Sequence, residues 1–581
     1  MPTHPRNQPL ESKSVGKVET EAYPYDLGSY SRKVTTTSDA AQTWFDRGLI
    51  WSYAFNHEEA ARCFARAAEH DPRCAMAYWG LAYAVGPNYN KTWARYDAED
   101  FKASAQRGSE ALARATELIG QASPVEQALV RALATRFPSA NASSGETPAT
   151  LDRAYADAMK AVHDDFPSDL EVKALYPESL MCIRPRQLWN LDTGAPTTQE
   201  TVDARHAIEA GFALPGGRTH AALNHLYIHL MEMSQTVALA LPAADRLRDL
   251  VPDGSHLQHM ATHIDAAVGD YRHSIESNRR AARSDDIYFE RDSASVLYKA
   301  YRTHNLSALV YAAMMSGRSE DAISAARHIR QVLTPELLAV RSPPMVDWVE
   351  FQGGILVHAL IRFGRWEELL EVEAPADAIL WSITTAVTYY GRAIALGVLG
   401  RKEEARAERD KFEQARAAVP RERRWGITAV AKEVLEVASL MCEGELVYRE
   451  GEHDRAFDLL RRAVTLEDNL PYSDPPLWMQ PVRHALGALL LEQGRSEEAE
   501  VAYRQDLGLS QDLSRRKARL GNVWGLHGLH ESLVRNGKED EAWALSLQKD
   551  VVTASADIRV AASCFCRVSA VGKQTNGVCC A

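Results

Sequence analysis

Apolar and polar positions follow a helical pattern along almost all of this 581-residue chain. Alanine, leucine, glutamate and arginine, which all favour helices, occur in every segment. Alternation of valine, isoleucine or threonine with polar residues, which would indicate strands, is scarce. The pattern therefore predicts an all-α protein.

The spacing is most regular in the stretch that begins at Ala41. Counted from Ala41 as position 1, aromatic residues stand at positions 4 and 24, glycine at 8, a large residue at 11, alanine at 20 and 27, and proline at 32: Trp44, Phe64, Gly48, Trp51, Ala60, Ala67 and Pro72. A small alanine at position 20 lets two helices pack closely, and the proline ends the second helix. The stretch predicts a helical hairpin and resembles the tetratricopeptide repeat, whose period is about 34 residues.

A glycine at position 15 with an alanine five residues later recurs down the chain and marks the turn inside a hairpin. The recurrences are Gly317/Ala322, Gly400/Ala405, Gly451/Ala456, Gly494/Ala499 and Gly537/Ala542. One such glycine is only a helix stop, but five at the same offset indicate a repeat. The resemblance implies a tetratricopeptide-like α-solenoid, a right-handed superhelix of helical hairpins.

Breaks in the pattern divide the chain into six parts. We expect a disordered N-terminal segment, N-terminal repeats, an interrupted helical region with loops, a histidine-rich pair of repeats, C-terminal repeats and a cysteine-containing tail. Their ranges are 1–25, 26–136, 137–200, 201–300, 301–560 and 561–581.

Charge and composition narrow the class of protein. The 66 basic and 78 acidic residues give a net charge of −12, which argues against nucleic acid as the main partner. The first residues lack the apolar run of a signal peptide, and no apolar stretch predicts a transmembrane segment. With eight cysteines in a long chain of this kind, we expect reduced thiols and a cytoplasmic location. The roles of Cys564, Cys566 and the Cys579-Cys580 end are left open.

The candidate chemistry lies in two adjacent repeats that begin at Ala221 and Ser255. Positions 5 and 9 of both repeats are histidines: His225, His229, His259 and His263. Residues four apart share one face of a helix, so each pair could chelate an ion. By resemblance to the tetratricopeptide family, these positions line the concave groove, where His256 and Glu232 join them.

Three or four histidines with a carboxylate suit a transition metal such as Zn, Cu, Fe or Mn. We predict a metal site made by His225, His229, His259 and His263, together with His256. Glu232 could be a ligand, orient a ligand or act as a general base. The site suggests a metal-dependent oxidase or hydrolase acting on a small molecule.

Two alternatives stay open at this point. The histidines could line a groove that binds a peptide, in a non-catalytic scaffold for protein–protein interaction, or they could be structural. Phe45, Trp79 and Tyr83 fall at groove positions of the first two repeats, and His304 opens a later one. These four residues are candidates to contact a small molecule or peptide in the groove.

The chain as a whole also resembles a group of bacterial and fungal tetratricopeptide proteins without a settled activity. The resemblance rests on Phe55–Ala60, Tyr78–Gly80, Asn224–Glu232, His256–Ile264 and Tyr472–Trp478. It supports the fold and draws attention to the histidines, and it implies no particular reaction.

Overall fold

A computed structural model describes the chain except for residues 1–22, 139–145, 293–294 and 572–581. The first part is a succession of helices with a few 3₁₀ turns between them. The helices are α1 (Asp39–Tyr53), α2 (His57–His70), α3 (Ala75–Val85), α4 (Ala98–Leu118), α5 (Pro124–Ala134), α6 (Pro148–Asp165), α7 (Leu170–Ile183), α8 (Gln199–Ala213), α9 (Ala221–Met231), α10 (Leu241–Leu250), α11 (Ser255–Val268), α12 (Tyr271–Arg291), α13 (Leu297–Ser316) and α14 (Ser319–Val332).

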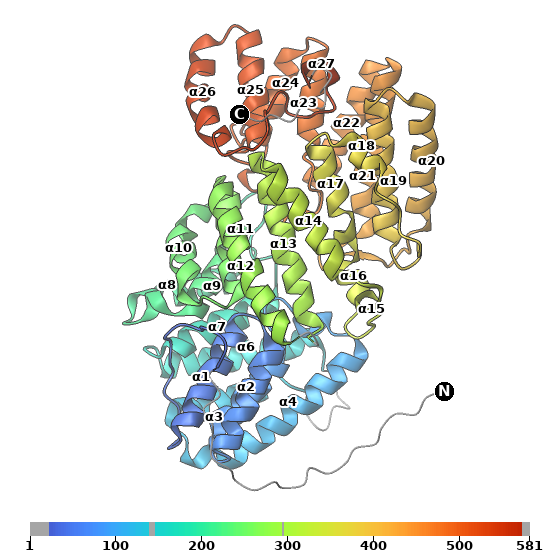
Figure 1. The fold of residues 1–581 in the computed structure, drawn as a ribbon. Coiled ribbons are helices and arrows are strands. Elements are labelled where there is room, and N and C mark those ends of the chain that lie inside the picture. The colour runs from blue at the N-terminus through green and yellow to red at the C-terminus, as the bar shows by residue number, and fades with distance from the viewer. Residues whose placement is uncertain (1–22, 139–145, 293–294, 572–581) are drawn as a thin grey trace, which may run out of the picture.

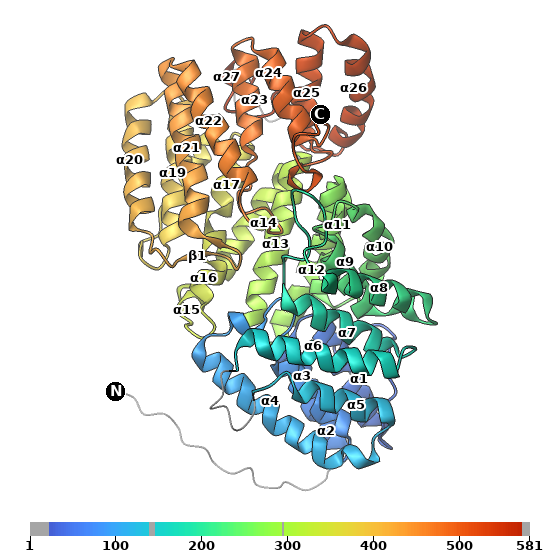
Figure 2. The same cartoon turned by 180° about the vertical axis from the view of Figure 1, so that it is seen from behind.

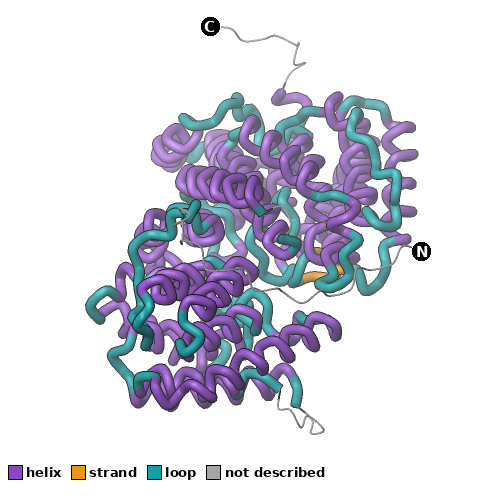
Figure 3. Tube along the Cα trace, turned by 60° about the horizontal axis from the view of Figure 1, so that its bottom comes forward, coloured by secondary structure: helices purple, strands orange, loops and turns teal. Residues whose placement is uncertain are grey.

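The second part continues in the same way, with one very small antiparallel sheet. Its elements are α15 (Pro335–Leu338), α16 (Met345–Val349), α17 (Ile355–Arg362), α18 (Trp366–Leu370), α19 (Ser382–Val398), α20 (Lys402–Ala418), β1 (Arg424–Trp425), β2 (Ala429–Val430), α21 (Ala431–Glu450), α22 (His453–Asp468), α23 (Val482–Glu492), α24 (Ser496–Asp506), α25 (Val523–Arg535), α26 (Glu539–Thr553) and α27 (Val568–Val571). The two short strands stand out in Figure 3.

Neighbouring helices pair as hairpins because small residues at fixed repeat positions let them pack closely. In the first repeat the Phe64 ring of α2 fills the space beside Gly48 of α1 and Gly80 of α3. A Cβ atom at Gly80 would lie 2.3 Å from that ring, so only glycine permits the close packing. The chain is thus a tetratricopeptide-like α-solenoid, and the predicted fold is confirmed.

The solenoid has two hydrophobic cores. One is formed by residues between Leu27 and Tyr298, and the other by residues between Tyr271 and Cys566. In Figures 1 and 2 the N-terminal half lies at the bottom and the C-terminal half at the top, with α11, α12 and α13 between them. Helix α13 packs into both cores, through Tyr298 near its start and through Leu306 onwards.

Both ends of the chain differ in part from the expectations. Tyr23 accepts a hydrogen bond from the Trp51 indole, so order begins before residue 25, while residues 1–22 lie outside the described part. Cys564 and Cys566 form a disulfide, which corrects the expectation of reduced thiols there. Cys579 and Cys580 lie outside the described residues.

The remaining described cysteines are free and buried: Cys63, Cys74, Cys182 and Cys442. Among the described helices, none combines the length and the apolar character that crossing a membrane requires.

Candidate metal centre

Three helices carry the histidines that the sequence singled out. Helices α9 and α11 pack against each other, and α11 also packs against α13. Helix α11 starts after Gly254 and ends where Gly269 takes a left-handed conformation. Its histidines lie beside rings of both neighbours: His256 beside His225 of α9, and His259 beside His304 of α13. The structure brings together His225, His229, His256, His259, His263 and His304.

Among the described residues, three sets of side chains could each hold a metal ion. Two of them are neighbouring groups of histidines, and the third, His229, Glu232 and His263, takes one histidine from each. In both groups the candidate ligand atoms lie within 4.8 Å of one another. The first group is His225, His229 and His256, and the second is His259, His263, His304 and Asp474. The groups adjoin, because the ring centroids of His229 and His263 are 5.5 Å apart and those of His256 and His259 are 5.7 Å apart.

Four of the rings are held through Nδ1 by oxygen acceptors. His225 Nδ1 lies 2.8 Å from the Tyr53 carbonyl oxygen, and His259 Nδ1 lies 2.8 Å from Asn278 Oδ1. His229 Nδ1 is 3.0 Å from one oxygen of Glu232, whose other oxygen contacts His263 Nδ1. Because these acceptors need a donor, each Nδ1 carries a proton, and in a neutral ring Nε2 then keeps its lone pair.

Several ring nitrogens of the first group have no hydrogen-bond partner, whereas Nε2 of His259 and Nε2 of His263 pair with each other. Nε2 of His225 and of His229, and both ring nitrogens of His256, are buried without a hydrogen-bond partner. The Nε2 atoms of His259 and His263 face each other at 3.1 Å. Leaving buried polar atoms unpaired costs about 1–3 kcal/mol each, so the arrangement calls for something positive between them.

Glu232 has both carboxylate oxygens engaged, so it is placed to orient the histidines. Besides the two imidazoles, it accepts a 2.8 Å hydrogen bond from the Tyr472 hydroxyl. It is fully buried, at 0% exposure. This geometry supports the orienting role among the three that the sequence left open.

The cluster does not lie in an open groove, and that expectation is wrong here. His225, His229, His256, His259 and His263 are all buried, with at most 4% of their surface exposed. The segment that contains Tyr472 and Asp474 reaches back from the C-terminal half and covers them. The sequence pattern could not reveal this cover, since the segment is more than 200 residues away.

Burial and mutual repulsion keep most of these imidazoles neutral. Burial lowers the pKa of His229 to about 4 and that of His304 to about 3. Burial, with neighbouring histidines, also lowers the pKa values of His225, His256 and His259. Neutral imidazoles are the form that binds metal ions.

His263 is the exception, because two carboxylates act on it. Burial alone would lower its pKa, but Asp474 and Glu232 raise it above the ordinary value. Burial would raise the pKa of Glu232, yet His263 and His229 outweigh it and hold that pKa well below the ordinary range. The carboxylate of Glu232 is therefore ionised and balances positive charge in the cluster.

Phe55 is a part of the site that the sequence reasoning missed. It occupies repeat position 15, where later repeats have glycine, and it adopts the left-handed φ of 55°. Its ring stacks on His256 at 5.0 Å and lies 4.6 Å from the His225 ring. A bulky residue in this backbone region is strained, and such strain is common at functional sites.

Asp474 and Asn278 were missed as well. Asp474 carries a carboxylate oxygen 3.5 Å from His263 Nε2, and Asn278 fixes the ring of His259. Neither belongs to the paired-histidine helices α9 and α11, so the repeat spacing does not select them. The only signals were the Tyr472–Trp478 stretch, noted as part of a resemblance, and the position of Phe55 in the repeat.

The predicted aromatic groove residues lie elsewhere. Phe45 packs on Phe64 with no exposed surface, and Trp79 stacks on Tyr83 at 5.3 Å inside the N-terminal core. These three residues do not join the histidine cluster. His304 does join it, since its ring lies 4.5 Å from that of His259.

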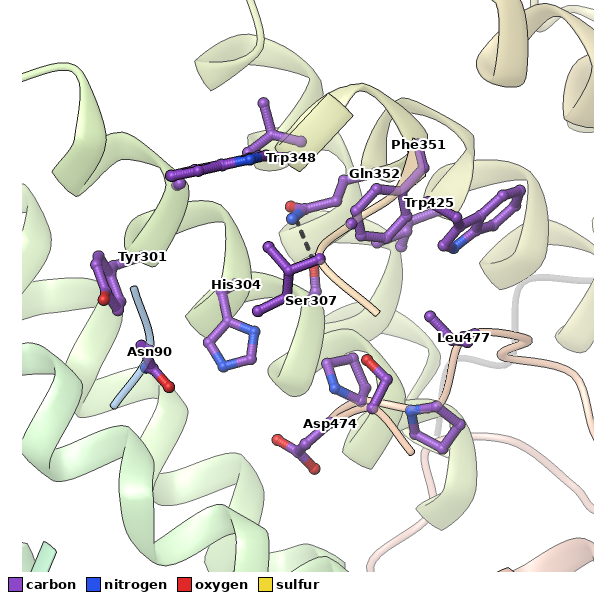
Figure 4. A pocket seen from close by; sticks show the side chains of 18 of the residues that line it. Asn90, Tyr301, His304, Ser307, Trp348, Phe351, Gln352, Trp425, Asp474 and Leu477 are labelled. Carbon is purple, nitrogen blue, oxygen red and sulfur yellow. Dashed lines mark hydrogen bonds between the residues drawn. The ribbon is translucent and has the colours of Figure 1, made fainter. Parts of the chain in front are cut away.

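A cavity of about 150 Å³ begins where His304 and Asp474 end the cluster. Figure 4 shows both side chains at one side of the cavity and Trp348, Phe351 and Trp425 at another. Most of its walls are apolar, with Ser307 and Gln352 joined by a 3.1 Å hydrogen bond among them. A small molecule with an apolar ring would fit beside the second group of ligands.

Comparisons with known proteins add little to this geometry. No protein-family model matches the chain, and no curated protein does. A human IFIT1 dimer with m7Gppp-AAAA is 10% identical over 90% of this chain and 92% of that one, with a TM-score of 0.32. Yeast Tom70 is 12% identical over 88% of this chain and 98% of that one, with a TM-score of 0.29. The APC/C hetero-tetramer Cut9-Hcn1 is 11% identical over 92% of this chain and 97% of that one, with a TM-score of 0.27. At such scores the similarity carries no argument about this chain.

Proposed function

We propose that this solenoid is a metalloprotein whose histidine cluster binds transition-metal ions and acts on a small molecule in the adjoining cavity. One observation carries the proposal: imidazoles anchored through Nδ1 direct unpaired Nε2 atoms toward common points. Buried polar atoms normally have a hydrogen-bond partner. Here Nε2 has no hydrogen-bond partner on His225 or His229, and neither ring nitrogen has one on His256. Both nitrogens of His57 and of His358 are also unpaired, so the weight rests on several such rings meeting in one cluster.

The donor set limits the metal. Neutral imidazoles with one available carboxylate suit Zn, Cu or Fe better than Mg or Ca, which prefer oxygen. A bound metal would supply Lewis-acid or redox chemistry at the edge of the cavity. The chain's own contribution is to fix the rings through Glu232, Asn278 and Tyr53, and to exclude water with Phe55.

The cavity determines the class of molecule that reaches the cluster. Trp348, Phe351 and Trp425 form an apolar wall on another side of the cavity from His304 and Asp474 (Figure 4). A small ring-containing molecule would pack on these aromatic rings and turn its reactive group toward the histidines. Whether the reaction is oxidation or hydrolysis depends on the metal. We also propose that the protein is cytoplasmic, as the sequence led us to expect.

A thermal-shift experiment tests metal binding. The protein is stripped with a chelator and melted with and without Cu(I), Zn(II), Fe(II) or Mn(II), one at a time. An ion that binds only the folded chain raises Tm, because binding adds to stability by mass action. We expect at least one ion to raise Tm in the wild type and to have little effect in the His229→Ala/His263→Ala variant. Equal shifts in both proteins would contradict the proposal.

The scaffold alternative rests on a different surface. The histidines are buried, so a peptide cannot reach them as the open groove would have allowed. Helix α26 instead exposes Trp543, Leu547 and Val551, which lie four residues apart on one face. An apolar stripe at the end of a solenoid is a surface for protein contact. It is the first place to examine if the metal experiment fails.

A further inference from the structure

We infer that the cluster is a dinuclear centre, with one metal ion on His225, His229 and His256 and a second on His259, His263, His304 and Asp474. The inference rests on the proposed function and adds the number of ions and the ligands of each. The two groups share no residue. A single ion could not reach all six rings, since metal–nitrogen bonds are only about 2.0–2.1 Å long.

The facing Nε2 atoms of His259 and His263 carry the second site. Both rings have their Nδ1 atoms directed at oxygen acceptors, Asn278 Oδ1 and Glu232. The two Nε2 atoms lie 3.1 Å apart, so either a shared proton or a metal ion must stand between their lone pairs. Two nitrogens bound to one metal ion lie roughly 2.9–3.3 Å apart, given bonds of about 2.05 Å and angles of about 90–109°. The observed separation therefore fits two ligands of one ion.

Ring nitrogens of His225, His229 and His256 are buried without a hydrogen-bond partner, which supports the first site. The His225 ring centroid lies 4.8 Å from that of His229 and 5.0 Å from that of His256. No nitrogen available to the interior of this group has a hydrogen-bond partner. The Phe55 ring closes one side of the group, so the space between the rings is shielded from solvent.

Glu232 could itself form a ligand set with His229 and His263, but its oxygens face their Nδ1 atoms, so we assign it to neither site. One oxygen orients His229 of the first group and the other orients His263 of the second. A carboxylate held in this way increases the basicity of both rings at once. The ions would consequently bind with coupled affinities, because loss of one changes the charge that Glu232 must balance.

The charged groups around the cluster indicate which metal ion to use in the test. Glu232 and Asp474 are the carboxylates in contact with the cluster, and the Arg186 guanidinium also acts on His229 and His263. Two divalent ions would leave a large uncompensated charge in a buried space, whereas two monovalent ions would be nearly balanced. Cu(I) is monovalent and binds imidazole, so it is the metal to add.

The test is a Cu(I) titration of the full chain, under anaerobic conditions, against a colorimetric Cu(I) chelator. We expect two ions per wild-type chain. His225→Ala should remove only the first site and His304→Ala only the second, so that each variant binds one ion. The double variant should bind none. His273→Ala, which changes a half-exposed histidine on α12 outside the cluster, should keep two.

The outcomes separate this inference from the proposed function. One ion in the wild type, lost in either single variant, would overturn the dinuclear centre and leave a metalloprotein. If the wild type binds no Cu(I), the dinuclear centre is overturned, and the thermal shifts with the other ions then decide the proposed function. Circular dichroism checks that the variants fold, and His304→Gln replaces His304→Ala if the latter does not. The wild-type count decides the inference even if every variant unfolds.

Discussion

His229 and His263 are joined through a single carboxylate, because each presents its Nδ1 to a different oxygen of Glu232. The two histidines belong to different helices, α9 and α11, and to different groups of candidate ligands. Glu232 is buried and also accepts a hydrogen bond from Tyr472 of the C-terminal half. The orientation of both groups therefore depends on one side chain.

Replacing Glu232 by glutamine should weaken metal binding without unfolding the chain. An amide has one acceptor oxygen and one donor nitrogen, so it can serve only one of the two Nδ1–H groups. The other ring must move its proton to Nε2 and lose its ligand lone pair. We expect affinity to fall about 10–100-fold, measured by competition with a chelator. Glu209→Gln, at a residue of α8 that contacts Tyr227, is the control. Unchanged affinity in Glu232→Gln would show that the carboxylate does not orient the rings.

Phe55→Gly tests the shielding of the first group. Glycine adopts the left-handed conformation freely, so the backbone should be retained while the ring over His225 and His256 is lost. We expect a chelator to remove the metal several-fold faster than from the wild type. Phe55→Tyr keeps the ring and should behave like the wild type. If Phe55→Gly releases metal at the wild-type rate, the ring does not protect the site.

The helical hairpins and the register of the four paired histidines were predictable from local sequence. Spacing within a repeat fixes which residues share a helix face, and the two repeats follow one another without an insertion. The burial of the site was not predictable. It arises because the C-terminal half returns Tyr472 and Asp474 to α9 and α11, a contact that depends on the course of the whole solenoid. Phe55 carried a local signal, a bulky residue at a glycine position.

Filling the cavity should block small molecules and leave the metals in place. Ala300 lines the cavity, and Ala300→Trp would occupy much of its roughly 150 Å³. Indole serves as a probe with the size and apolar character that the walls suit. In saturation-transfer NMR, we expect indole to bind the wild type and to be lost in Ala300→Trp, with an unchanged metal content. Ala418→Trp, on the exposed end of α20, should bind indole normally. Equal binding to all three proteins would place the indole elsewhere.

The stability of the C-terminal half should fall as pH rises from about 4.5 to 7. Burial raises the pKa of Glu445 to about 7, and Arg449 only partly offsets this. The folded chain therefore holds this proton more tightly than the unfolded chain, whose glutamate has a pKa near 4.3. Stability from this proton is full below about pH 4.5 and is lost as pH rises toward 7.

Glu445→Gln isolates that contribution, because an amide does not ionise. At pH 8 the variant should be more stable than the wild type by up to about 3 kcal/mol, and the difference should shrink toward pH 4.5. Urea unfolding across this pH range measures it. Glu433→Gln, at an exposed position of α21, should follow the wild type. A difference that stays constant with pH would exclude Glu445 as the cause.

The most direct test of the metal centre is the metal content of the protein as isolated, purified without a histidine tag or chelator. Elemental analysis is run on the wild type beside the His225→Ala/His259→Ala variant, which removes one ligand from each group. The account predicts one or more equivalents of a transition metal in the wild type, two if both sites are filled, and little in the variant. Equal traces of metal in both proteins would contradict it.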